Sequence, residues 1–225
     1  MEDDEDDNEY ITCKVVMVGE PGVGKTSIIS RYVLNQFSNV VISTTGASYA
    51  TKIIELDKDN KIKFQIWDTA GQERFRSLAK IFYQNAAAVV LVYDITVRDT
   101  FEKLKEYWIK EIKDNAPSDI IIALAGNKSD NYEFEVVSLK EGQDLAKQID
   151  AIYKSTSAML SNGIEELFKS IALKFVNPTS SFFNSVPASK DDLKKSTIIE
   201  KKSIKIKKWR KKSAANRIFV KLFWR

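Results

Sequence analysis

The feature that most constrains this chain is the stretch GEPGVGKT at residues 19–26, which matches the pattern GxxxxGK[ST] at every fixed position. It follows an apolar run at residues 15–18 and precedes a helix-compatible segment at residues 27–34. This order is typical of a strand, a tight glycine turn and the N-terminus of a helix. A chance glycine turn would need neither flanking element. The stretch therefore predicts a loop that binds phosphate.

The residue types in this loop suit the phosphates of a nucleotide. Gly22 and Gly24 let the backbone turn its N–H groups inward, and the dipole of the following helix adds partial positive charge. Lys25 supplies a cation for the outer phosphates, and the Thr26 hydroxyl supplies a hard oxygen ligand for Mg²⁺. The predicted nucleotide-binding residues of this loop are Glu20, Gly22, Val23, Gly24, Lys25, Thr26 and Ser27.

The charges of the 225-residue chain are unevenly placed, although the net charge is only +4. Seven acids and no base lie within residues 1–9, whereas residues 190–225 carry fourteen Lys or Arg and three acids. A composition of 44% hydrophobic and 29% charged residues is ordinary for a folded domain. We therefore expect one neutral domain with polar extensions of opposite charge.

The single cysteine, Cys13, excludes an internal disulfide and favours a reducing compartment. The acidic start does not resemble a secretion signal, and no apolar run is long enough to cross a bilayer. We therefore expect a cytoplasmic protein without a signal peptide or a transmembrane helix.

Apolar strands alternate with helical patterns along residues 10–176. A polar turn at residues 57–60 predicts a hairpin, and the apolar face of residues 99–115 predicts a helix capped by Asp99. The predicted strands span residues 10–18, 49–56, 61–67, 86–93, 119–125 and 151–155, and the clearest predicted helices span residues 27–34, 99–115, 139–149 and 164–176. This alternation predicts an α/β fold, with a mostly parallel sheet covered on both faces by helices. Ligands of such sheets bind over the carboxyl ends of the strands.

The third predicted strand ends in a DxxG element. The Asp68 carboxylate is placed to hold Mg²⁺ through water, and the Gly71 N–H is placed to approach a γ-phosphate. The element alone is a weak signal, because a turn at a strand end would also satisfy it.

The fifth predicted strand runs into an NKxD element at residues 127–130. The Asp130 carboxylate can accept hydrogen bonds from the N1 and N2 donors of guanine, and adenine presents no such pair. Ser157 and Ala158 follow the last predicted strand, where a backbone N–H can meet the guanine O6. NKxD alone could be a solvated loop, but three motifs in this order at strand ends predict a guanine nucleotide site.

With these motifs in place, residues 10–176 resemble a small GTPase of the Ras superfamily, and specifically of the Rab family. The resemblance lies in WDTAGQERF at residues 67–75, LVYDIT at 91–96 and TTGASY at 44–49. GASY and RSLAKIFY are most similar to the endosomal branch. The resemblance implies a P-loop NTPase small G domain with a six-stranded sheet, an acidic extension at residues 1–9, a linker at 177–189 and a basic hypervariable tail at 190–225.

The resemblance also implies roles for individual residues. The implied catalytic residues are Gln72, which orients the attacking water, Lys25 and Thr44. The implied magnesium ligands are Thr26 and Thr44, with Asp68 acting through water. Further nucleotide contacts are implied for Phe37, Thr44, Gly71, Asn127, Lys128, Asp130, Ser157, Ala158 and Met159. An aromatic trio of Tyr49, Trp67 and Phe82 would form the effector surface, although ordinary core packing is an alternative.

The implied mechanism is a switch that regulates vesicular traffic. The γ-phosphate and Mg²⁺ hold Thr44 and Gly71, and hydrolysis of GTP to GDP releases these two loops. No motif places an arginine in cis, so unaided turnover is expected at about 10⁻⁴ to 10⁻³ per second. An exchange factor, a GTPase-activating protein and effectors are the implied partners. We expect a monomer and no nucleic-acid partner for the domain.

Several residues depart from the family pattern. Pro21 replaces a small residue in the phosphate loop and removes one N–H, which leaves open how hydrolysis responds. Thr45 replaces an apolar residue, Asn85 replaces a common glycine, and Met159 stands where lysine is common. These departures bear more on effector choice than on nucleotide binding.

The basic tail is the largest departure, because no cysteine for prenylation follows Cys13. Residues 201–225 mix bases with aromatic and aliphatic side chains, which would suit the surface of an anionic vesicle membrane, endosomal or other. A solvated tail, a nucleic-acid or nuclear-import patch, and a missing last exon are the alternatives.

Two other functions also stay open for the domain. Asp130 argues against an ATPase, and the intact Lys25, Thr26, Thr44 and Gln72 argue against a scaffold that ignores nucleotide.

Overall fold

The computed structural model describes residues 10–38, 44, 48–58, 60–69 and 79–178. The acidic extension and the basic tail lie outside the described residues, so their predicted roles stay predictions. Within the described part of the chain, none of the helices has the length and apolar character that crossing a bilayer needs.

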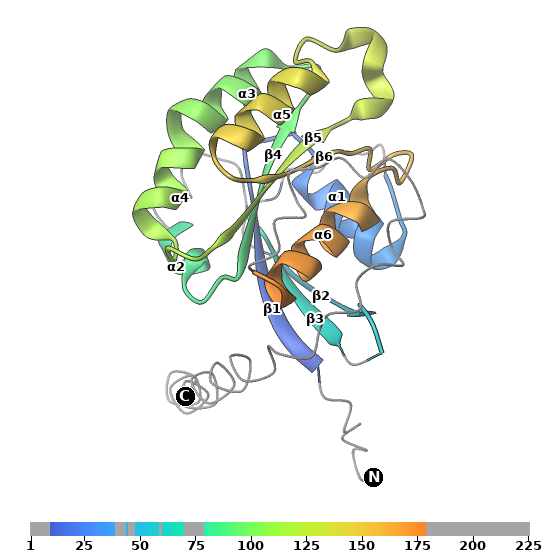
Figure 1. Ribbon diagram of the computed structural model, residues 1–225. Helices are drawn as coiled ribbons and strands as arrows, with labels where there is room; N and C mark the ends of the chain where they lie inside the picture. The colour runs from blue at the N-terminus through green and yellow to red at the C-terminus, as the bar shows by residue number, and fades with distance from the viewer. Residues whose placement is uncertain (1–9, 39–43, 45–47, 59, 70–78, 179–225) are drawn as a thin grey trace. The chain divides into compact units, whose positions relative to one another are not determined.

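A twisted sheet runs through the middle of the domain, with helices on both faces (Figure 1). Its strand order is β2-β3-β1-β4-β5-β6; β2 is antiparallel to β3, and the other neighbouring pairs are parallel. The strands are β1 (Tyr10–Val18), β2 (Ser48–Glu55), β3 (Lys61–Asp68), β4 (Ala88–Asp94), β5 (Ile121–Asn127) and β6 (Ile152–Ser155). The predicted mostly parallel α/β sheet and its single hairpin are thus confirmed.

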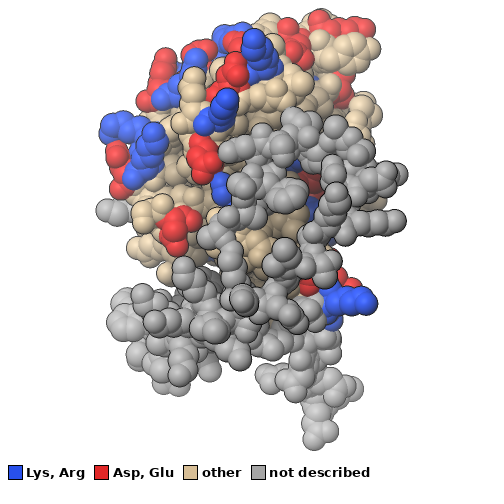
Figure 2. Space-filling model, viewed as in Figure 1, with Lys and Arg blue, Asp and Glu red and all other residues tan. Residues whose placement is uncertain are grey.

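The helices form two layers. The layer on one face contains α1 (Lys25–Leu34) and α6 (Ile164–Val176). The other contains α2 (Ala79–Tyr83), α3 (Arg98–Lys103), the π-helical segment η2 (Leu104–Trp108), α4 (Ile109–Asn115) and α5 (Leu139–Gln148). A 3₁₀ segment, η3 (Ser129–Phe134), follows β5. Lys and Arg side chains alternate with Asp and Glu over the outer side of α3 to α5 in Figure 2.

Alternate residues of β1 enter opposite cores. Val15 and Met17 pack under α1 and α6, whereas Val16 and Val18 pack under the α3 to α5 layer. All four side chains are buried, as expected of a central parallel strand with both faces covered. The carboxyl ends of β1, β3, β4, β5 and β6 consequently meet at one edge of the sheet.

The long helical segment differs from the prediction in two ways. The N-cap of α3 is Val97, and Asp99 lies in the first turn instead of capping it. The prediction of Asp99 as the cap is therefore wrong, because the chain turns into the helix two residues earlier. The apolar face of residues 98–115 is as predicted, but its middle is π-helical.

Candidate functional site

The predicted phosphate loop lies between β1 and α1, as the motif requires. Gly24 is the N-cap of α1 with a φ of 95°. A Cβ at this position would lie 2.3 Å from Nδ2 of Asn127, so only glycine fits. The Cβ of a side chain at Gly19 would lie 2.2 Å from the carbonyl oxygen of Val92. Close packing on β4 and β5 therefore fixes the shape of the loop.

Lys25 is folded over this loop and buried. Its ammonium group donates to the carbonyl oxygens of Gly19, at 2.7 Å, and Glu20, at 2.9 Å. Burial lowers the pKa of Lys25 to about 8, and the Asp68 and Glu20 carboxylates oppose that shift. The loop therefore encloses one buried ammonium group, which is poorly solvated and suited to bind an anion.

Three oxygen-bearing side chains meet beside Lys25. The Thr26 hydroxyl donates to Oδ2 of Asp68 at 2.5 Å and lies 2.9 Å from the Thr44 hydroxyl. Asp68 is buried, and Oδ1 of its carboxylate has no hydrogen-bond partner among the described residues. Burial raises the pKa of Asp68, whereas Thr26 and Lys25 lower it. A buried carboxylate oxygen without a donor is costly unless a cation or water satisfies it.

These donors fit magnesium. Two hydroxyls and one carboxylate are hard oxygen ligands, and Mg²⁺ takes its remaining ligands from water and phosphate. When bound there, Mg²⁺ would neutralise charge on the outer phosphates.

Asn127, at the end of β5, joins three segments. Its Nδ2 donates to the Val23 carbonyl at 2.8 Å, and its Oδ1 accepts from the Thr156 hydroxyl at 3.2 Å. Asn127 and Thr156 are buried. The amide therefore ties the phosphate loop to β5 and to the turn after β6, which holds the distant motifs in one geometry.

Asp130 and Ser157 lie together although 27 residues separate them. The Ser157 hydroxyl donates to Oδ1 of Asp130 at 2.5 Å and accepts from the Leu160 N–H at 2.9 Å. The Ser129 N–H donates to the Thr156 carbonyl, which joins the same two turns through the backbone. The structure thus brings the NKxD element and the turn after β6 into one cluster.

Lys128 forms an ion pair that the sequence motifs do not predict. Its ammonium lies 2.6 Å from Oδ2 of Asp94, whose side chain is almost fully buried. Oδ1 of Asp94 accepts from both the N–H and the hydroxyl of Thr96. Lys128 itself has a φ of 64°. The ends of β4 and β5 are therefore joined by a charged contact that fixes the direction of the Lys128 stem.

Glu20 is linked to the helical layer, a contact that no motif indicates. The indole N–H of Trp108, at the end of η2, donates to Oε1 of Glu20 at 2.9 Å. Trp108 is buried. A carboxylate in a phosphate loop would repel phosphate, and this hydrogen bond holds it on the side of η2. The helical spacing of Trp108 predicts only core packing, so the sequence carries no signal for the pair.

The predicted aromatic trio is contiguous. The rings of Tyr49 and Trp67 lie 5.3 Å apart, and those of Trp67 and Phe82 lie 5.8 Å apart. Tyr49 is half exposed, whereas Trp67 and Phe82 pack partly against the core. The arrangement suits a surface that partners reach at one end and the core supports at the other.

The remaining predicted residues fall into two groups. Gly71 and Gln72 lie outside the described residues. Phe37 packs partly against the α1 and α6 core, Ala158 is buried and Met159 is half exposed. Gly22 has a φ of 76°, and Ser27 lies in the first turn of α1.

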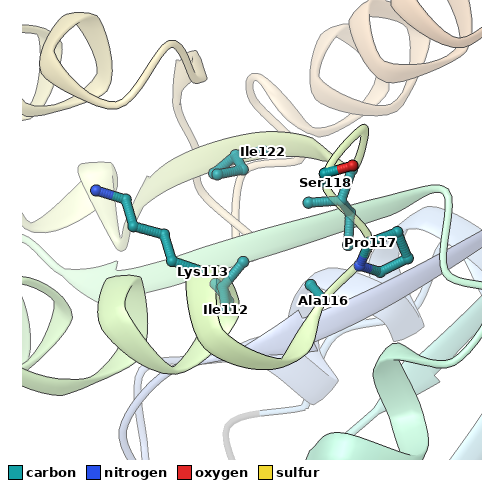
Figure 3. Close-up of a pocket in the computed structure, with 7 residues that line it drawn as sticks. Ile112, Lys113, Ala116, Pro117, Ser118 and Ile122 are labelled. Carbon is teal, nitrogen blue, oxygen red and sulfur yellow. The ribbon is translucent and has the colours of Figure 1, made fainter.

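A separate small cavity of about 180 Å³ lies at the end of α4. Its lining comes from the last turn of α4, the following turn and the start of β5 (Figure 3). Ile122, in its wall, is near the start of β5, whereas Asn127 ends that strand. The cavity is therefore not part of the candidate site.

Comparison with known proteins agrees with this geometry. The model of the Ras family matches residues 14–177. "Ras-related protein Rab-31" of Mus musculus is 46% identical over 159 residues, which cover 71% of this chain and 80% of that protein. "Ras-related protein Rab-22A" of Homo sapiens is 44% identical over 159 residues, covering 71% and 81%. "Ras-related protein Rab2BV" of Beta vulgaris is 42% identical over 166 residues, covering 73% and 77%.

Proposed function

The chain belongs to the Ras family and is a Rab-type small GTPase, and from this premise we propose which of its residues bind the nucleotide and drive the switch. The observation that carries the proposal is the meeting of four separate strand ends: the loop after β1, Asp68 at the end of β3, Asn127 at the end of β5 and the turn after β6. Parallel strands bring their carboxyl ends together, and ligands of such sheets bind there.

In this proposal the phosphate loop binds the phosphates. Lys25 exchanges the carbonyls of Gly19 and Glu20 for the β- and γ-phosphates, and the anion it then faces stabilises its charged form against the cost of burial. Thr26 and Thr44 would bind Mg²⁺ through their hydroxyls, and Asp68 would hold it through water. The short contacts among these three side chains support the assignment.

Asp130 selects the base. Its carboxylate accepts from N1 and N2 of guanine, and Ser157 orients it by donating to Oδ1. Ala158 and Met159 line the same turn, Phe37 lies at the edge of the base, and the Lys128 stem lies over the ring. The ion pair of Lys128 with Asp94 supports this last placement, because it fixes the stem.

The switch rests on Thr44. Its hydroxyl lies 2.9 Å from that of Thr26, which supports a shared position beside the proposed metal site. Thr44 would hold Mg²⁺ and sense the γ-phosphate, so hydrolysis would release it. Gln72 orients the attacking water, and Gly71 anchors the second loop. An exchange factor, a GTPase-activating protein and effectors acting on the trio of Tyr49, Trp67 and Phe82 complete the cycle, and endosomal vesicles are the proposed place of action.

A binding titration tests the proposal. Purified protein is stripped of nucleotide and titrated with GDP, GTP, ADP and ATP, with Mg²⁺ and with excess chelator. We expect GDP and GTP to bind tightly with Mg²⁺, weakly without it, and ADP and ATP to bind far more weakly. Equal binding of guanine and adenine nucleotides would overturn the proposed base site.

A second experiment tests the proposed catalytic role of Gln72. In a single-turnover assay, Gln72→Leu is expected to hydrolyse bound GTP at least tenfold more slowly than wild type, because leucine cannot orient the attacking water. Thr26→Asn is the matched variant at the metal site, expected to favour GDP over GTP. A Gln72→Leu protein as fast as wild type would remove Gln72 from the mechanism.

A further inference from the structure

Arg31, in the last turn of α1, makes four hydrogen bonds with its guanidinium group. Nε donates to the Ala158 carbonyl at 2.8 Å, and Nη2 donates to the Met159 carbonyl at 3.2 Å. Nη1 donates to both the carbonyl, at 3.0 Å, and the side-chain oxygen, at 3.1 Å, of Asn35. One planar group therefore joins the end of α1 to the turn that follows β6, 127 residues away.

Because Arg31 holds the carbonyls of Ala158 and Met159, it also fixes the direction of the N–H group in each of these two peptides. A trans peptide is planar, so its C=O and the next residue's N–H point in opposite directions. Arg31 holds the Met159 carbonyl, and the Leu160 N–H on the other side of that peptide donates to the Ser157 hydroxyl. That hydroxyl in turn donates to Asp130. A continuous path of hydrogen bonds therefore runs from Arg31 to Asp130.

We propose that Arg31 is a positioning residue for guanine recognition, which holds Asp130 in place through the Met159–Leu160 peptide and Ser157. The inference rests on the proposed function of Asp130. It adds that the base contact depends on a side chain from α1, which does not itself contact Asp130.

The chemistry of the group explains why arginine stands here. Its planar fork presents several N–H donors at fixed angles and can bind the carbonyls of Ala158, Met159 and Asn35 at once. A lysine ammonium at the same place has three donors but no fixed fork, and it would hold fewer of these carbonyls together. Arg31 is also in the last turn of α1, where a cation is favoured by the helix dipole. That second role is purely structural, so the test must separate stabilisation of α1 from positioning of Asp130.

Inosine diphosphate separates them, because its base lacks the 2-amino group that Asp130 would bind. The experiment measures dissociation rates of GDP and IDP from wild type, Arg31→Met, Arg31→Lys and Ser157→Ala, with Mg²⁺ present. The control is Arg98→Met, since Arg98 also donates to a loop carbonyl, that of Val136, and pairs with Glu141. Thermal unfolding of each variant is measured alongside.

Wild type is expected to release IDP at least tenfold faster than GDP, because IDP lacks one hydrogen bond to the charged Asp130 carboxylate. In Arg31→Met, GDP release accelerates about tenfold while IDP release changes little, so the preference falls. Arg31→Lys retains part of the preference, and Arg98→Met retains all of it. Combining Arg31→Met with Ser157→Ala adds little to either change alone, because both break the same path.

Two results would overturn the inference. If Arg31→Met accelerates GDP and IDP release equally, or lowers only the unfolding temperature, Arg31 is a structural brace and the proposed base site is unaffected. If wild type itself does not distinguish GDP from IDP, the proposed role of Asp130 fails and the inference fails with it. Should Arg31→Met not fold, Arg31→Lys answers the same question with charge and size kept.

Discussion

At the scale of single residues, the site depends on positions where the backbone and a neighbouring side chain leave no alternative. Gly24 and Asn127 illustrate this, because the amide occupies the space that any side chain at residue 24 would need. The motif from residue 19 to 26 and the motif from residue 127 to 130 are therefore parts of one packed unit.

Replacing Gly24 with alanine tests this packing. Gly24→Ala meets both a φ of 95° and the close Asn127 amide, so we expect a loss of unfolding free energy of about 2 kcal/mol or more and much weaker GDP binding. Gly22→Ala is the matched control, because φ is 76° there but no atom lies within 4 Å of a Cβ. Urea unfolding without nucleotide compares the two, and equal losses would show that the Asn127 contact is unimportant.

The hydrogen bond from Trp108 to Glu20 gives a second prediction. Trp108→Phe removes the donor and keeps an aromatic ring, so we expect about 1 kcal/mol less stability and faster GDP release. In a Glu20→Ala background the same change is expected to affect GDP release much less. A double-mutant cycle on GDP release measures this coupling, and a coupling near zero would contradict the contact.

At the scale of secondary structure, the helices of one layer are held by local pairs as well as by the core. The N-terminus of α5 has a capping box, in which the Ser138 hydroxyl accepts from the Glu141 N–H and the Glu141 carboxylate accepts from the Ser138 N–H. Arg98 of α3 pairs with the same carboxylate. One side chain therefore caps α5 and joins it to α3.

The pH dependence of stability tests this junction. Arg98, followed by Ser138, lowers the pKa of Glu141 from its usual 4.5 to about 2. Since the folded-state pKa is depressed, the contribution is complete above pH 4.5 and is lost as pH falls toward 2. Urea unfolding of wild type and Glu141→Gln should therefore differ most near neutral pH, differ less as pH falls below 4.5, and converge only near and below about pH 2. A difference that does not depend on pH would mean that the Arg98 pair is not formed.

The sequence predicts the elements that carry the site far better than the contacts that hold it together. The apolar run of β1 gives its bounds, Tyr10–Val18, and the polar turn at residues 57–60 gives the hairpin. Helix-to-helix and helix-to-loop contacts carry no such local pattern. The π-helical turn at Leu104–Trp108 is also not predictable from the sequence, because it leaves the spacing of the apolar residues unchanged.

Long-range polar pairs are the part of the site that sequence reasoning misses. Arg31 belongs to none of the sequence motifs, and nothing near it in the chain indicates Ala158 or Met159 as partners. The pairing of Lys128 with Asp94 is equally hidden, since it depends on β4 and β5 being neighbours. Such contacts follow only once the strand order is known.

At the scale of the whole domain, one mostly parallel sheet places the candidate site at one edge and buries its central strand. Cys13 lies in the middle of β1 and is fully buried, and burial raises the pKa of its thiol well above the ordinary range. The thiolate, which is the reactive form, is therefore unavailable in the folded protein.

Labelling of Cys13 consequently reports opening of the domain. We expect a thiol reagent to react at least about a thousandfold more slowly with the folded protein than with the urea-unfolded protein. Added GDP and Mg²⁺ should slow the reaction further, because a ligand that binds only the folded state stabilises it. Reaction at the unfolded rate in native buffer would contradict the burial of β1.

The most direct test of guanine recognition changes one group on the base and one on Asp130, so that a hydrogen-bond donor and its acceptor trade places. Xanthine has a carbonyl in place of the guanine 2-amino group, and Asn at position 130 would offer an N–H to match it. Competition between GDP and xanthosine diphosphate is measured for wild type and Asp130→Asn. We predict that wild type prefers GDP by about 100-fold or more and that Asp130→Asn prefers the xanthine nucleotide. A variant that keeps the wild-type preference for GDP would show that Asp130 does not read the base.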